Sequence, residues 1–239
     1  MSRVVILGES HVRIYGNKEN IFPVFINSGE HFCLTKLDSA IRQVESFLDN
    51  FSLNKEDIIL LQMGEPAARI QLNYGLYPHY EDVTTKKVRI VEPVVNEKFL
   101  VEMCKNYMRI GDFIKDRIEN KFYILSPTGC YPSLVPAFVF MNDVLKERYS
   151  DFYIDLLTDI VDKNASIKQE YMPVSFANDP LHLGTKVTEI LLKKMKENHI
   201  IDDLGIYVDN SLSDLMSRDF KDHFKYNPRF KCWVLESKK

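Results

Sequence analysis

The sequence predicts an α/β protein in which helices connect the strands of a mostly parallel, five-stranded sheet. Short apolar runs alternate along the chain with longer amphipathic stretches, which is the pattern of parallel strands and crossover helices. Several of the apolar runs stop at turns that contain glycine, serine or proline. A chain of 239 residues, 45% hydrophobic and 27% charged, has the composition of a globular protein with one large domain.

The five expected strands are the short apolar runs. The first covers 3–7 and ends at Gly8, and the third, 57–63, ends at Gly64. The other three cover 22–27, 122–125 and 152–156. Runs of this length are typical of strands that are buried in a sheet.

Four helices are expected where apolar side chains recur at helical spacing. In the first of them, Ile41, Val44 and Leu48 share one face. The four helices cover 37–50, 95–120, 134–149 and 185–198. Residues 74–94 are rich in tyrosine, proline and charge, and we interpret them as an insertion over the sheet edge.

The last 40 residues differ in character, so we divide the chain into a main domain over 1–199 and a C-terminal extension or small subdomain over 200–239. Aromatic residues stand among basic ones here: Phe220, Phe224, Tyr226, Phe230 and Trp233. One interpretation is a segment that packs on the sheet edge or on a partner subunit of a homo-oligomer. The other is a substrate lid or a glycan-binding surface, because sugar sites also place aromatic rings near polar groups.

Charge and composition exclude several classes of function. A net charge of −3 and a pI near 6.1 leave no excess of basic residues to neutralise nucleic-acid phosphates. No apolar run reaches the length of a membrane span, and the N-terminus lacks a secretory signal pattern, which favours the cytoplasm. The four cysteines are too scattered for a disulfide framework or a zinc site, so we expect neither metal nor cofactor.

A candidate nucleophile stands directly after the first strand, in Gly8-Glu9-Ser10-His11. The glycine permits a sharp exit from the strand, and the N-terminus of a following helix would present N–H groups to an anion formed at the serine. Three similar segments follow other strands: Ser28-Gly29, Gly64-Glu65-Pro66 and Ser126-Pro127-Thr128-Gly129. Because ligands bind outside the carboxyl ends of parallel strands, we expect the four segments to meet at one rim of the sheet.

Asp179 and His182 are the candidate partners of this serine. A carboxylate on one ring nitrogen of His182 would fix the tautomer that leaves the other nitrogen able to accept the Ser10 proton. In a second interpretation Asp179 caps the helix over 185–198, with Pro180 at the first helical position. We expect His11 to be a structural or substrate-facing residue, not a base.

In the order of these motifs the chain resembles the SGNH hydrolase superfamily, the GDSL-type esterases and acyltransferases. Gly8-Glu9-Ser10-His11 matches the first block of that family and Asp179-Pro180-Leu181-His182 the last, while Gly29 and Gly64 lie near the middle two. The resemblance spans residues 3 to about 198 and implies a flavodoxin-like, three-layer α/β/α sandwich. It also implies Ser10 as nucleophile, His182 as general base and Asp179 as its orienting partner.

The third block departs from the family pattern. The sequence reads Gly64-Glu65-Pro66-Ala67 here, so the asparagine that serves the family's oxyanion hole is absent. Removal of one such donor costs on the order of 10²–10³ in rate. Glu65 and Arg69 resemble a Gly-Glu-Ile-Asp-Cys-Arg variant of the block, in which they would take the polar positions and Arg69 would face an oxyanion or an anionic substrate. Alternatively, the two are an ordinary helical surface pair at i,i+4 spacing.

The function that follows is a serine-dependent esterase or O-acyltransferase acting on an acylated carbohydrate or a similar small ester. Backbone N–H groups at Ser10 and Gly29 would stabilise the oxyanion, with Gly64, Glu65 and Arg69 nearby. The alternative is a catalytically inactive SGNH-fold module that binds or assembles components in polysaccharide biosynthesis. A nucleotide-binding domain is disfavoured, because no glycine-rich phosphate loop follows the first strand.

Overall fold

The computed structural model describes residues 3–15, 21–26, 33–74, 95–130, 134–172, 182–201, 224–227 and 232–235. Gly29 and Asp179 lie outside the described residues, as does most of the expected insertion over 74–94.

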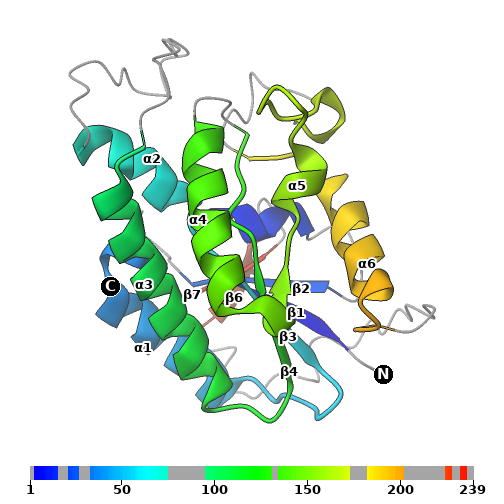
Figure 1. The fold of residues 1–239 in the computed structure, drawn as a ribbon. Coiled ribbons are helices and arrows are strands. Elements are labelled where there is room, and N and C mark those ends of the chain that lie inside the picture. Colours follow the sequence, from blue (N-terminus) through cyan, green and yellow to red (C-terminus); the bar gives the residue numbers. More distant parts are fainter. Residues whose placement is uncertain are drawn as a thin grey trace.

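A central sheet of five parallel strands confirms the predicted α/β class (Figure 1). Its strands lie in the order β2-β1-β3-β4-β5, which is the flavodoxin-like order. They are β1 (Val4–Gly8), β2 (Ile21–Phe25), β3 (Ile58–Gln62), β4 (Lys121–Leu125) and β5 (Tyr153–Ile154). β1 is central and buried along its whole length, which explains why its sequence is apolar without alternation.

Helices cover both faces of this sheet and complete a three-layer sandwich. The helices are α1 (Leu37–Asn50), α2 (Glu65–Tyr74), α3 (Glu97–Lys115), α4 (Val135–Arg148), α5 (Leu157–Ile160) and α6 (Val187–Glu197). Short 3-10 turns cover Ser10–Tyr15 (η1), Cys33–Thr35, Ser150–Phe152 and Gln169–Tyr171. In one layer α3 contacts α1, α2 and α4, whereas α6 contacts η1 and β5 (Figure 1). The connection from β1 to β2 and the connection from β2 to β3 run in opposite directions across the sheet. Because such connections are right-handed, the α3 group and the α6 group lie on opposite faces.

Two further strands extend the sheet beyond β2. β7 (Cys232–Leu235) pairs parallel to β2, and β6 (Phe224–Asn227) pairs antiparallel to β7. The expected C-terminal segment over 200–239 therefore contributes to the same sheet as the residues before it. The pairing with β2 involves Val24 and Phe25, and Pro23, which has no N–H to donate, stands just before it.

Several elements differ from the sequence expectations. The segment after Ser10 is a six-residue 3-10 turn and not an α-helix. The helix expected over 95–120 is shorter than predicted, because α3 begins at Glu97 and ends at Lys115. α2 is not among the four expected helices, although one interpretation of Glu65 and Arg69 placed them on a helix. Among the described residues, no helix is long and apolar enough to cross a membrane.

Candidate functional site

The carboxyl ends of β1, β3 and β4 meet at one rim of the sheet. The Glu9 N–H donates to the Gln62 carbonyl at the end of β3, over 3.3 Å. The Gln62 amide in turn donates to Thr128 Oγ1 after β4, over 3.1 Å. Three of the four expected segments therefore converge, and the fourth, at Gly29, is outside the described residues. Strand order reverses between β1 and β3, which is where open α/β sheets bind ligands.

Gly8 allows β1 and β3 to approach this closely. A Cβ atom at Gly8 would lie 2.0 Å from the Gln62 carbonyl oxygen and 2.7 Å from Val12 Cγ1. No other residue type fits without displacing one of the two strands. The Ser10 position therefore depends on this glycine two residues before it.

Ser10 and His182, which are 172 residues apart in sequence, are in direct contact. His182 Nε2 lies 3.0 Å from Ser10 Oγ, which is hydrogen-bond distance. The His182 ring is buried, with 6% of the residue exposed. The Thr188 hydroxyl of α6 donates to the Ile14 carbonyl of η1 over 3.2 Å and so ties the histidine's segment to the serine's turn.

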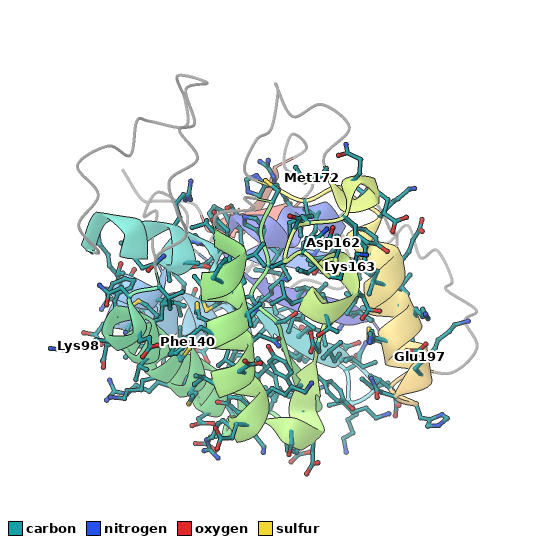
Figure 2. All side chains as sticks on the ribbon, turned by 45° about the horizontal axis from the view of Figure 1, so that its top comes forward. Lys98, Phe140, Asp162, Lys163, Met172 and Glu197 are labelled. Carbon is teal, nitrogen blue, oxygen red and sulfur yellow. The ribbon has the colours of Figure 1, made fainter. Side chains whose placement is uncertain are left out.

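The chain at Tyr171 and Met172, after α5, also holds the segment that carries His182. The Gly184 N–H donates to the Tyr171 carbonyl over 2.7 Å. A Cβ atom at Gly184 would lie 2.8 Å from the carbonyl oxygen of Met172, whose side chain is labelled in Figure 2. His182 is thus fixed between η1 and the chain at Tyr171–Met172.

The other ring nitrogen of His182 faces Arg13. An Arg13 guanidinium nitrogen lies 2.7 Å from His182 Nδ1. A guanidinium group can only donate, so this contact is a hydrogen bond in the tautomer of His182 that carries its ring proton on Nε2. Sequence reasoning did not single out Arg13. In a 3-10 turn, side chains at i and i+3 lie over one another, which brings Arg13 to the side of Ser10.

The expected partner of Nδ1, Asp179, lies outside the described residues. The interpretation in which Asp179 caps a helix is therefore not tested either. The α6 helix begins at Val187, and its N-cap residue is Lys186, whose side chain makes no cap hydrogen bond.

Glu65 is buried against His11, and the surface-pair interpretation of Glu65 and Arg69 is therefore wrong. Glu65 Oε2 lies 3.4 Å from His11 Nε2 and accepts a hydrogen bond from the Arg69 guanidinium over 3.2 Å. The Glu65 side chain is 2% exposed. Burial alone would raise the pKa of Glu65, but His11, Arg69 and His182 together hold it below its usual value, so this carboxylate is charged.

His11 lies against the ring of His182. The ring centroids of His11 and His182 are 4.4 Å apart, with an angle of 36° between the ring planes. Together with Glu65, the first residue of α2, this gives three contacts in a row that lead to the serine. The Glu65 carboxylate contacts the His11 ring, His11 contacts the His182 ring, and His182 contacts the Ser10 hydroxyl. The expectation that His11 is structural or substrate-facing did not include this contact with Glu65.

Glu9 is a second buried carboxyl with the opposite protonation. The Gly64 N–H donates to Glu9 Oε2 over 2.6 Å, and Oε1 has no hydrogen-bond partner in the described part of the chain. Burial raises the pKa of Glu9 to about 8, so this side chain is neutral at pH 7. The Gly64 N–H is occupied by Glu9, which leaves an oxyanion to be stabilised by other donors.

Metal chemistry has no candidate ligand set here: no group of three or more His, Cys, Asp or Glu side chains with metal-binding geometry occurs within the described ranges. Comparison of the chain with protein-family models and with curated proteins returned no match.

Proposed function

We propose that this protein is an SGNH-type serine esterase or O-acyltransferase that acts on an acylated carbohydrate or a similar small ester. The observation that carries the proposal is the 3.0 Å contact between Ser10 Oγ and His182 Nε2 at the strand-order switch point of a flavodoxin-like sheet. A nucleophile and a base at hydrogen-bond distance are the first requirement of acyl transfer. A cytoplasmic location and a homo-oligomer formed through the C-terminal segment stay predictions from the sequence.

In the proposed reaction, Ser10 Oγ attacks the ester carbonyl while its proton passes to His182 Nε2. His182 then returns the proton to the departing alcohol, and an acyl-enzyme remains. Water or an acceptor hydroxyl, activated by the same histidine, releases the acyl group. For the first step the ring must hold its other proton on Nδ1, where Asp179 is its partner by resemblance to the family.

The oxyanion formed in this reaction needs donors in place of the family's asparagine. Backbone N–H groups at Ser10 and Gly29 are the proposed donors. Arg69, held by Glu65 at the end of β3, adds a positive charge. Because its side chain is 20% exposed, Arg69 keeps contact with the solvent side of the site.

Covalent labelling tests the proposal directly. A fluorophosphonate probe should modify the wild-type protein at Ser10, with the adduct located by peptide mass spectrometry. Ser10→Ala should abolish labelling, while Ser150→Ala, at an exposed serine in another 3-10 turn, should leave it unchanged. Absence of labelling in folded wild-type protein at near-stoichiometric probe would refute the enzyme assignment.

The second candidate is a catalytically inactive SGNH-fold module that binds or assembles components in polysaccharide biosynthesis. The absence of the family's oxyanion-hole asparagine from Gly64-Glu65-Pro66-Ala67 favours it, because loss of one such donor costs on the order of 10²–10³ in rate. An unlabelled wild-type protein that still binds acylated oligosaccharides in calorimetry would support this candidate over the enzyme.

A further inference from the structure

Glu65 places a buried negative charge next to the two histidine rings of the candidate site. Its side chain is 2% exposed, and Oε2 lies 3.4 Å from His11 Nε2. The His11 ring also lies against the ring of His182, with 4.4 Å between the ring centroids. The Glu65 carboxylate and the candidate base therefore contact the same imidazole ring.

The geometry favours an electrostatic effect of Glu65 over a proton relay. The 3.4 Å separation from His11 is longer than an ordinary hydrogen bond, and neither ring nitrogen of His11 has a hydrogen-bond partner in the described part of the chain. A relay would need a short hydrogen bond at each step. An electrostatic interaction needs only proximity in a site that water does not screen, and Glu65, His11 and His182 are all buried.

The other charged and titratable groups around these rings are cationic or neutral. An Arg13 nitrogen lies 2.7 Å from His182 Nδ1, and Arg69 donates to Glu65 over 3.2 Å. Glu9 is neutral at pH 7, because burial raises its pKa to about 8. Among the carboxyl groups that the described residues place at this rim, Glu65 therefore supplies the negative charge.

Glu65 is incompletely bonded for a carboxylate buried for stability alone. Oε2 accepts a hydrogen bond from Arg69, but Oε1 has no hydrogen-bond partner among the described residues. Buried carboxylates in a purely structural role are paired and have their oxygens bonded. A charge kept in this state beside a candidate base points to a use in the reaction.

We propose that Glu65 is a positioning residue of the reaction, whose charge stabilises the imidazolium that His182 becomes when Ser10 attacks the ester. This inference rests on the proposed esterase or acyltransferase function. As the bond from Ser10 Oγ to the acyl carbon forms, the Oγ proton passes to His182, so the base gains a positive charge. A negative charge that the fold already holds in place lowers the energy of this state. The charge on the ring is lost again when the proton passes to the departing alcohol.

The interaction between Glu65 and His182 is mutual. Burial raises the pKa of Glu65, whereas His11, Arg69 and His182 together lower it to below its usual value. Because one interaction energy acts on both partners, Glu65 favours the protonated form of His182 to the same extent. This effect holds for either tautomer of the neutral ring, and it adds to the effect of every group that bonds Nδ1.

The pH dependence of Ser10 labelling by a fluorophosphonate tests the proposal. In Glu65→Gln, which keeps an oxygen for Arg69, the midpoint of the profile should fall by about one pH unit. The labelling rate above the midpoint should also fall, by about threefold to tenfold, because the imidazolium is less stable. Damage to the fold would lower the rate without moving the midpoint. Glu65→Asp keeps the charge and should keep the wild-type midpoint.

Three control variants isolate the interaction between Glu65 and His182. His11→Gln removes the second titratable ring and keeps a donor for Glu65, and Glu9→Gln removes a carboxyl whose pKa, raised by burial, lies near 8 and so within the measured range. The shift caused by Glu65→Gln should persist in both backgrounds. Its loss in His11→Gln would indicate a relay, and its loss in either background would overturn the proposal. Glu147→Gln, at an exposed position, should keep the wild-type midpoint.

Nuclear magnetic resonance of the histidine rings gives a readout that is independent of turnover. The pH at which the His182 ring titrates should be about one unit lower in Glu65→Gln than in the wild type. Equal titration of His182 in the two proteins would overturn the proposal.

The outcomes distinguish this inference from the function on which it rests. Absence of Ser10 labelling in the folded wild type refutes the function. Labelling of Ser10 with the same midpoint in Glu65→Gln as in the wild type overturns the inference and leaves the function standing.

Discussion

Replacement of Glu9 by glutamine should stabilise the protein increasingly as the pH rises. The pKa of Glu9 is raised by burial from 4.5 to about 8. Between these values the folded state binds a proton that the unfolded state has lost. The free energy of unfolding therefore falls by about 1.4 kcal/mol for each unit of pH. Below pH 4.5 both states are protonated and Glu9 contributes no such loss.

Over the full interval from pH 4.5 to 8 the free energy of unfolding falls by about 5 kcal/mol. At pH 7 the fall is about 3 kcal/mol. Glu9→Gln is neutral at every pH and retains a carbonyl oxygen for the Gly64 N–H, which donates to Oε2 in the wild type. The variant should therefore equal the wild type in stability near pH 4 and exceed it by these amounts at neutral and alkaline pH. The gain is reduced by the cost of burying the glutamine N–H group at the position of Oε1, where it has no hydrogen-bond partner among the described residues.

Urea unfolding followed by circular dichroism at pH 4.5, 7 and 8.5 measures the difference. Glu147→Gln, at an exposed position, controls for the loss of one carboxyl group. A stability difference between Glu9→Gln and the wild type that stays constant with pH would refute the reasoning. A difference that favours the wild type more strongly at high pH would show that Glu9 is charged in the folded protein.

Three other substitutions probe the rim and its support. Asp57→Asn should cost about 3–5 kcal/mol in urea unfolding, because the buried Arg3 guanidinium loses the carboxylate that pairs with it. Gly64→Ala should cost about 1–3 kcal/mol, because this residue has a φ of 114° and its Cβ would lie 3.0 Å from Met141 and Pro127. Glu65→Gln removes the negative charge beside the two histidine rings. The pH at which Ser10 labelling rises should therefore decrease by about one unit. An unchanged pH profile would show that Glu65 does not act on His182.

The sequence predicts the sheet and most of its helices because their patterns are local. The helix over 37–50 was placed at its observed bounds, since its apolar residues repeat at helical spacing and nothing outside the segment determines them. The five parallel strands are equally visible as apolar runs. β6 and β7 are short and lie among charged residues, and their strand conformation depends on pairing with β2, which no local pattern shows.

The candidate site was predictable to the extent that strand ends determine it. Ser10 and His182 were identified from their motifs, and the structure brings them into contact. The burial of Glu65 was not predictable from an i,i+4 pair with Arg69, because it depends on the chain after β4. A Cβ at Gly129 would lie 2.9 Å from Glu65 Cγ, so the β4 end packs directly on this side chain. Arg13 was missed because its contact is with His182, 169 residues further along the chain, and no local pattern shows such a contact.

The 172-residue separation between Ser10 and His182 has a consequence for the order of events during synthesis. Ser10 leaves the ribosome well before His182, the candidate base, which follows only after all five parallel strands have been made. Closure of so long a loop is a late and slow step of folding. A nascent or partly folded chain therefore carries a Ser10 that is not yet in contact with His182. Labelling of Ser10 by a fluorophosphonate would accordingly report the completion of folding in real time.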